Sequence, residues 1–302
     1  MKSKRIVYLS ILAAILGLIV FACDRSTDIA GDNIQLTTAD ISQAGDDATS
    51  DNIYEEVDGS VESQLANLES TDYQTMMQKS AEDENYPCLV VTVDHPDSTF
   101  FPKIITLDYG YGCSRIINND TITKKGKIII TLTDRMWVPG AQRIVTFDNF
   151  YINDIKVEGT RTITFNGLNA DSLLDYDITL AGGKLIFNDT LQYTRESRLK
   201  REWYRAPNPM DDIVYLSGSI TGTNLSGENY SRMITNKLML IHCYEYARRW
   251  TIVEGTVVST VGTTETTIDY GDGTCEGAAY VMRNGHKREI QNRIRHRLNG
   301  IG

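Results

Sequence analysis

Histidine is scarce in this chain, and its four histidines stand far apart in the sequence. None of them forms a His-x-x-x-His pair, the spacing that places two zinc ligands on one face of a helix. The sequence also lacks a Gly-x-Ser-x-Gly motif, which presents the nucleophile in many serine hydrolases. An active site assembled from distant residues would leave no such motif. Because nothing in the sequence points to one, we expect no catalytic residues and a protein that is not an enzyme.

Positive charge is lacking as well, and the formal net charge is -10. The deficit lies in residues 24–86, where 16 acidic residues face only Arg25 and Lys79. The rest of the chain after residue 86 is nearly neutral. Binding to nucleic acid needs a basic surface that attracts phosphates. We therefore expect no nucleic-acid partner.

Long apolar runs are absent after residue 22, but one is present before it. Three basic residues among the first five precede an apolar run over residues 6–22, the pattern of an export signal. The run is near the lower length limit for a membrane span and ends in a small residue, Ala22, followed by Cys23. This ending resembles the lipobox of bacterial lipoproteins, in which the cysteine is acylated and becomes the new amino terminus. An ordinary cleaved signal or a retained membrane anchor is the alternative.

We accordingly expect residues 1–22 to be a lipoprotein signal peptide and Cys23 to carry the lipid, such as palmitate. The bacterial modification adds several acyl chains, and each buried methylene contributes about 0.8 kcal/mol, so the protein would be held permanently in the outer membrane. Exposure at the cell surface and exposure to the periplasm both remain open.

Residues 23–52 are rich in Asp, Ser, Thr, Gly and Ala and contain few large apolar residues. Such a segment cannot bury enough surface to offset its ordering entropy, so we predict an acidic flexible tether. Residues 53–84 differ, because apolar residues there recur near helical spacing. They predict an amphipathic helix and a linker; the apolar positions are Val57, Val61, Leu65, Leu68 and Met76.

From residue 85 to residue 302 the apolar pattern has a period of two, which is typical of strands. Short turn signals such as Asn153-Asp154, Asn166-Gly167, Asn188-Asp189 and Asn284-Gly285 separate the runs. Strands joined by tight turns are antiparallel. The sequence therefore predicts a mainly β fold, an antiparallel meander that forms a sandwich or an open barrel, with one N-terminal amphipathic helix.

The β domain contains an internal hairpin repeat. Asp108-Tyr-Gly-x-Gly112 precedes Cys113, and Asp269-Tyr-Gly-x-Gly273 precedes Cys275. In each copy a further cysteine stands ahead of the first strand of the hairpin. In an antiparallel hairpin the start of the first strand lies beside the end of the second, so we predict the disulfides Cys88–Cys113 and Cys243–Cys275. Reduced thiols that merely pack are the alternative.

Two aspartates of the second copy, Asp269 and Asp272, suggest a calcium site, because clustered carboxylates beside glycine turns coordinate hard cations. The first copy has Tyr111 where the second has Asp272, so we prefer ordinary turn chemistry and expect no cofactor, with calcium as the alternative.

Aromatic and basic residues gather in the second half of the chain. The aromatic residues either fill a β core or present a surface for sugar rings or a protein partner. The basic run 195–205 is typical of a solvated strand face, and its alternatives are contacts with acidic glycan, lipid headgroups or the protein's own acidic segment. The aromatic positions are Tyr193, Trp203, Tyr204, Tyr215, Tyr230, Tyr244, Tyr246 and Trp250.

Several stretches together resemble a family of exported lipoproteins of the Bacteroidota. They are the two Asp-Tyr-Gly-x-Gly segments with their cysteines, Gly126-Lys-Ile-Ile129, Thr146-Phe-Asp-Asn-Phe-Tyr-Ile-Asn153, Glu158-Gly-Thr-Arg-Thr-Ile163 and Gly218-Ser-Ile-Thr-Gly-Thr223. The resemblance implies a lipid-anchored envelope protein and transfers no activity.

We expect a binding or scaffolding module that contacts the membrane through its N-terminal lipid and whose partner is a glycan, a lipid or an envelope protein. The alternatives are a carrier of a lipid or other apolar ligand in an open β-barrel and a surface glycan-binding module.

Overall fold

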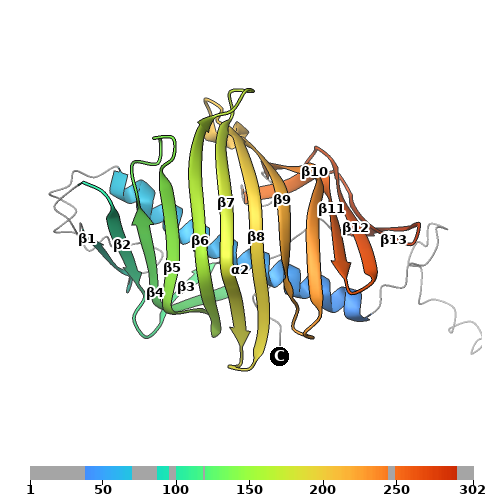
Figure 1. The fold of residues 1–302 in the computed structure, drawn as a ribbon, viewed down its shortest axis with the longest axis horizontal. Helices are drawn as coiled ribbons and strands as arrows, with labels where there is room; N and C mark the ends of the chain where they lie inside the picture. The colour runs from blue at the N-terminus through green and yellow to red at the C-terminus, as the bar shows by residue number, and fades with distance from the viewer. Residues whose placement is uncertain (1–37, 70–86, 95–99, 118–119, 244–248, 291–302) are drawn as a thin grey trace, which may run out of the picture.

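The computed structural model describes residues 38–69, 87–94, 100–117, 120–243 and 249–290. In these residues the chain forms one antiparallel sheet of 14 strands and one long helix, α2 (Thr38–Glu69), which crosses the sheet (Figure 1). The expected fold class, mainly β and antiparallel with one N-terminal helix, is confirmed. The sheet does not close, because β1 and β14 form its two ends.

The strands follow one another along the chain with short connections. The first seven are β1 (Val90–Asp94), β2 (Lys103–Asp108), β3 (Cys113–Ile117), β4 (Asp120–Leu132), β5 (Gln142–Ile152), β6 (Ile155–Leu168) and β7 (Leu174–Phe187). The others are β8 (Leu191–Tyr204), β9 (Ile213–Thr223), β10 (Asn229–Cys243), β11 (Arg249–Val261), β12 (Thr264–Asp272), β13 (Ala279–Arg283) and β14 (His286–Ile290). A single 3-10 turn, η1 (Pro209–Asp211), separates β8 from β9.

The sheet is a meander in which almost every strand pairs with the next one in sequence. The exception is β2, which pairs with β4 instead of β3, while β3 pairs only with β4 and lies off the main path. The predicted turns Asn153-Asp154 and Asn188-Asp189 have positive φ at both residues, as two-residue hairpin turns require. Asn166-Gly167, in contrast, was wrongly predicted as a turn, because both residues lie inside β6.

Glycine-containing bulges interrupt the long strands. The register shifts next to Lys125, Glu158 and Glu254 each coincide with a glycine of positive φ. A bulge bends a strand and increases its twist, which curves the sheet around α2. At Gly126 a Cβ atom would lie 1.9 Å from the carbonyl oxygen of Asn149, so no larger residue fits there without moving the backbone. The glycines at these shifts are Gly126, Gly159 and Gly255.

The helix begins earlier than expected, and the part of the expected segment after residue 69 lies outside the described residues. The prediction placed a flexible tether at 23–52 and the helix within 53–84, but α2 spans Thr38–Glu69. The tether prediction is therefore wrong for residues 38–52. It relied on the lack of large apolar residues, whereas this part of the helix is held against the sheet by hydrogen bonds. Residues 1–37, including the expected signal peptide and Cys23, lie outside the described residues. None of the helices in the described ranges is long and apolar enough to cross a membrane.

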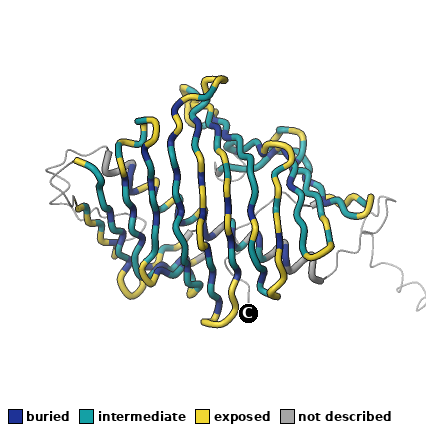
Figure 2. The backbone as a smooth tube through the Cα atoms, in the orientation of Figure 1, coloured by how far each residue is buried: buried dark blue, intermediate teal, exposed yellow. Residues whose placement is uncertain are grey.

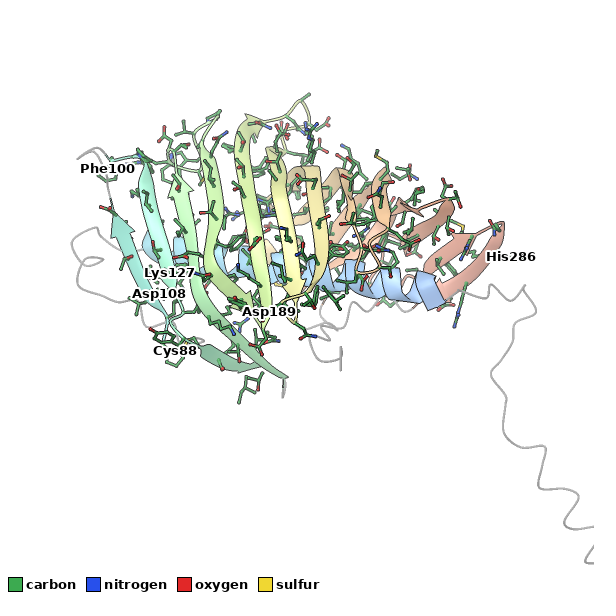
Figure 3. All side chains as sticks on the ribbon, turned by 60° about the horizontal axis from the view of Figure 1, so that its bottom comes forward. Cys88, Phe100, Asp108, Lys127, Asp189 and His286 are labelled. Atoms are coloured by element: carbon green, nitrogen blue, oxygen red, sulfur yellow. A yellow bond between two sulfur atoms is a disulfide. The ribbon has the colours of Figure 1, made fainter. Side chains whose placement is uncertain are left out.

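One face of the sheet, which we call the inner face, carries α2 (Figure 3). Along the central strands buried residues alternate with exposed ones, so the inner face is covered and the outer face meets solvent (Figure 2). The main core lies between α2 and the strands on this face. It includes Ile53, Val57 and Val61 of the helix together with Ile128 and Ile130 of β4, all fully buried.

Candidate binding face

The buried side of α2 changes character along the helix. Its first half buries polar side chains, those of Gln43, Asp47 and Ser50. Its second half buries mostly apolar or aromatic ones, which are Ile53, Tyr54, Val57, Val61 and Leu65, together with the polar Gln64. Burial of a polar group costs free energy unless a hydrogen bond compensates it. The first half of α2 can therefore lie only where the sheet supplies hydrogen-bonding partners.

A chain of hydrogen bonds supplies those partners near the start of α2. Asn224, between β9 and β10, donates to Oε1 of Gln43 over 2.8 Å. Gln43 donates in turn to Oδ1 of Asp47 over 2.8 Å, and the Tyr193 hydroxyl donates to the same oxygen over 2.7 Å. Burial raises the pKa of Tyr193, so its hydroxyl remains a proton donor at neutral pH. This end of the helix is held by directional bonds.

Asp51, one turn farther along α2, is shared by two guanidinium groups. Arg232 donates to its Oδ2 over 3.0 Å, and Arg195 donates to its Oδ1. Burial alone would raise the pKa of Asp51, but the attraction of Arg232 and Arg195 outweighs burial and lowers the pKa to about 2. All three groups are therefore charged at neutral pH, and the carboxylate offsets part of the charge of the two guanidinium groups.

The next part of α2 also pairs its carboxylates closely with the sheet. Both oxygens of Asp58 accept hydrogen bonds from Arg161, over 2.8 Å and 2.6 Å, in a bidentate geometry. The side chain of Lys124 is fully buried, and its Nζ lies 2.7 Å from Oε1 of Glu56. A buried cation needs such a partner, because the loss of hydration is otherwise uncompensated.

Arg143 of β5 and Arg201 of β8 are neutralised much less well. Both approach the same atom, Oε1 of Glu62, at 3.4 Å and 3.8 Å. The side chain of Glu62 is 51% exposed, whereas those of Arg143 and Arg201 are only 7% and 18% exposed. The Nε atom of each arginine is buried and has no hydrogen-bond acceptor among the described residues. Burial lowers the pKa of Arg201, and the charge of Arg143 adds to the decrease.

A second apolar cluster lies on the inner face over strands β9 to β12. Its buried members are Leu238, Val257 and Tyr270, and the half-buried residues packed on them are Leu216, Ile234, Leu240, Ile252 and Ile268. None of the described α2 residues belongs to it, whereas α2 supplies five residues of the main core. Trp203 and Trp250 are in edge-to-face contact beside this cluster, with ring centroids 6.4 Å apart. We call these residues together the β9–β12 patch.

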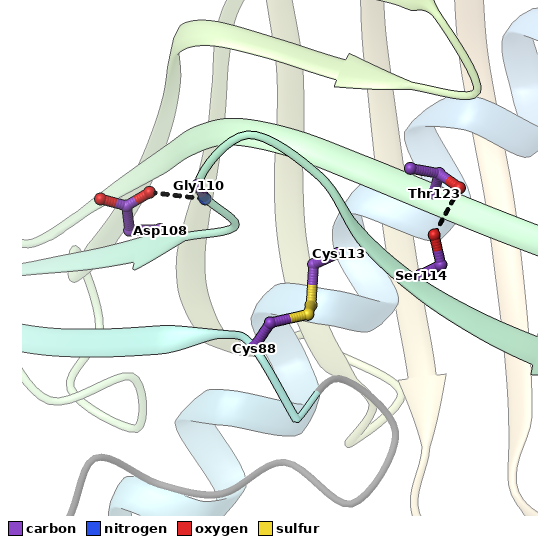
Figure 4. Close-up of a disulfide and its surroundings, with 6 residues drawn as sticks. All are labelled: Cys88, Asp108, Gly110, Cys113, Ser114 and Thr123. Atoms are coloured by element: carbon purple, nitrogen blue, oxygen red, sulfur yellow. Dashed lines mark hydrogen bonds between the residues drawn. A yellow bond between two sulfur atoms is a disulfide. The ribbon is translucent and has the colours of Figure 1, made fainter.

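Both predicted cysteine pairs are present as disulfides, Cys88–Cys113 and Cys243–Cys275. The first joins the residue ahead of β1 to the start of β3 (Figure 4). The repeated Asp-Tyr-Gly segments also share a hydrogen bond from the glycine amide to the aspartate. The amide of Gly110 donates to Asp108 over 2.8 Å, as seen in Figure 4, and that of Gly271 donates to Asp269 over 3.1 Å. The repeat in sequence therefore recurs as one side-chain-to-backbone hydrogen bond, although Asp108 ends β2 whereas Asp269 and Gly271 lie inside β12.

The candidate calcium residues make turn contacts. Asp269 accepts from the amide of Gly271, and Asp272 accepts from both the amide and the hydroxyl of Thr274. Nowhere in the described part of the chain do three or more His, Cys, Asp or Glu side chains gather as metal ligands would. The hydrogen bonds of Asp272 lower its pKa, as expected for a carboxylate that organises a turn.

The aromatic residues singled out in the sequence are divided between the two faces of the sheet. Tyr193 and Tyr230 are buried on the inner face with rings 5.2 Å apart, whereas Tyr204 is exposed. Trp250 lies against His242 with ring centroids 4.0 Å apart and the ring planes tilted by 35°. Tyr244, Tyr246, His95 and His296 lie outside the described residues. The aromatic cluster thus fills part of the inner face, as the core interpretation predicts.

Sequence reasoning missed the charged contacts between α2 and the inner face. It treated the acidic segment and the basic run 195–205 separately, although contact between the two was one of the alternatives. Arg195 and Arg201 stand an even number of residues apart in β8, which places both on one face. An acidic helix and a strand with arginines at even spacing were the available signal. Comparisons with protein-family models, curated proteins and solved structures returned no match, so the geometry alone guides the interpretation.

Proposed function

We propose that this chain is a lipid-anchored envelope protein that carries an apolar or amphiphilic ligand on the inner face of its open sheet, beside α2. The lipobox ending at Cys23 supports the anchor. The observation that carries the binding function is the β9–β12 patch, an apolar cluster that contains none of the α2 side chains that the structure describes. Its half-buried members keep part of their apolar surface exposed, and such surface on a concave face commonly binds a ligand.

The shape of the fold favours a carrier over a module that binds flat sugar rings. A curved sheet with an apolar inner face can surround an acyl chain on one side. Sugar rings need a flat aromatic platform, whereas the planes of Trp203 and Trp250 meet at 83°. A protein scaffold, the remaining alternative, would use an exposed surface, and the patch lies on the inner face.

Tryptophan fluorescence tests the proposal directly, because the chain has three tryptophans and two of them lie beside the patch. The third, Trp137, is 60% exposed in the loop between β4 and β5, so Trp137→Phe leaves a protein that reports only on the inner face. We expect laurate, titrated below its micelle concentration, to shift the emission of this variant to shorter wavelength in a saturable way. Lipid extracted from protein purified from native membranes should be identifiable by mass spectrometry.

A pair of variants on one strand provides the control. Leu240 belongs to the patch, and Leu240→Asn should weaken laurate binding about tenfold, because a polar amide replaces apolar surface. Met233 lies on the outer face of the same strand and is 51% exposed, so Met233→Asn should leave binding unchanged. Circular dichroism and the melting temperature establish that both variants fold. The proposal fails if no C12 amphiphile changes the emission and no lipid accompanies the purified protein.

A further inference from the structure

The arrangement of charge beside the β9–β12 patch specifies the ligand further. We propose that Arg143 and Arg201 form an oxyanion site that binds the carboxylate or phosphate headgroup of a single-chain amphiphile, whose tail lies along the patch. This inference rests on the proposed carrier function and names its ligand class.

The first step of the argument is the unequal neutralisation of the inner-face arginines. Arg161 forms two hydrogen bonds shorter than 3 Å with one carboxylate, and Arg195 and Arg232 each donate to Asp51. Arg143 and Arg201, in contrast, share one carboxylate, that of Glu62, at 3.4 Å and 3.8 Å, and Arg201 also lies over the rings of Tyr176 and Trp203. Two guanidinium groups that approach one oxygen and retain unpartnered Nε donors can take a further anion between them.

The second step is the direction in which the sheet continues from this site. Arg201 of β8 is paired directly with Leu216 of β9, and Leu216 is paired with Leu238 of β10. Directly paired residues of antiparallel strands project to the same face. A straight row on the inner face therefore leads from the cationic site into the apolar patch.

The adjacent row runs in the same direction and is apolar throughout. Trp203 is paired with Val214, Val214 with Leu240, and Leu240 with Ile252. Each strand step covers about 4.8 Å, so the row from β8 to β11 extends about 14 Å, close to the length of a C12 chain. A charged head at one end and an apolar row of that length fit an anionic amphiphile and do not fit a free inorganic anion or a neutral hydrocarbon.

The test compares C12 ligands that differ only in their headgroup, using the Trp137→Phe protein. We expect laurate and dodecyl phosphate to bind at least about tenfold more tightly than neutral dodecanol, since each would gain charge-assisted hydrogen bonds from the two arginines. Whichever of laurate and dodecyl phosphate binds more tightly identifies the headgroup as carboxylate or phosphate. Arg143→Gln and Arg201→Gln should each lower the affinity for the two acids nearly to the affinity for dodecanol. The affinity for dodecanol itself should not change.

Two further variants separate ligand binding from a structural role. Arg198 lies on the outer face of β8 and is exposed, so Arg198→Gln should change none of these affinities. Glu62→Gln removes the carboxylate that competes for the arginines, so it should tighten binding of the acids about tenfold; a purely structural role for Glu62 predicts no such gain.

The inference is overturned if the acids and dodecanol bind equally well to the parent protein, in which case the carrier function still stands. It is also overturned if the arginine variants keep the preference for acids, or if inorganic phosphate displaces dodecyl phosphate at equal concentration. Absence of binding by every C12 ligand would instead remove the proposed function itself.

Discussion

Asp51 shows how strongly one residue of α2 is tied to the sheet. Replacing it by asparagine leaves Arg195 and Arg232 buried without their common counter-charge. Breaking a buried ion pair by removal of one partner typically costs about 3–5 kcal/mol, so Asp51→Asn should lower the free energy of unfolding by that amount at pH 7. Urea denaturation measures the change. Asp154→Asn is the control, because the exposed pair Lys125–Asp154 contributes less than about 1 kcal/mol.

The same residue makes stability depend on pH in a defined window. The pKa of Asp51 is about 2 in the folded protein and 3.8 by its ordinary value, so the folded state favours the charged form. The contribution of Asp51 is therefore complete above about pH 4 and is lost as the pH falls towards 2. The Asp51→Asn protein should lose less stability than the parent across this window. An identical acid dependence of the two proteins would contradict the assignment.

Residue-level predictions from the sequence succeeded where the contact is local. The cysteine pairs and the turn bonds of Asp108 and Asp269 follow from hairpin geometry and short spacing. The pairing of Asp51 with Arg195 joins residues 144 positions apart, and no local sequence pattern predicts it. Charge complementarity indicates that acidic and basic segments meet, but only the register of the strands decides which residues do.

Among the elements, the hairpin formed by β1 and β2 is fixed by the disulfide Cys88–Cys113. The bridge closes a loop with a sequence separation of 25 residues, which in the chain-entropy model stabilises the fold by about 3.5 kcal/mol. The double variant Cys88→Ala/Cys113→Ala should therefore lower the free energy of unfolding by about that amount in urea denaturation. A parallel double variant at Cys243 and Cys275 should give a similar loss, and reducing agent should then affect each variant only through its remaining bridge. A loss under 1 kcal/mol would refute the estimate.

The strand pattern was predictable where the inner face is apolar and was obscured where it is charged. Strands β5 and β6 show the predicted period of two, because most of their inner residues are apolar and most outer ones are polar. In β8 this period is obscured, since arginine occupies inner positions 195 and 201 as well as the outer position 198, although the run 195–205 was expected to form a strand face. A strand that is polar on both faces shows no period of two. The first half of α2 escaped prediction for the same reason, because its buried residues are polar.

For the protein as a whole, the predicted lipid at Cys23 would decide at which membrane the protein works. If Cys23 is acylated, Cys23→Ser should abolish incorporation of labelled palmitate, whereas Ser26→Ala should leave it unchanged. Mass spectrometry of the mature amino terminus provides a second measurement, since the native protein should begin at a modified Cys23. Palmitate labelling that persists in Cys23→Ser would exclude the lipobox interpretation.

The position of α2 also has a consequence for the order of folding. The helix precedes every strand in the chain, yet its bond to Arg161 spans 103 residues and its bond to Arg232 spans 181. Contacts of such long range make folding slow, because most of the chain must be ordered before they form. A growing chain therefore presents α2 as a hydrated acidic segment whose counter-charges do not yet exist. Among the described elements, the first to be synthesised is therefore one of the last to be completed, because its ion pairs need a sheet that has already formed as far as β10.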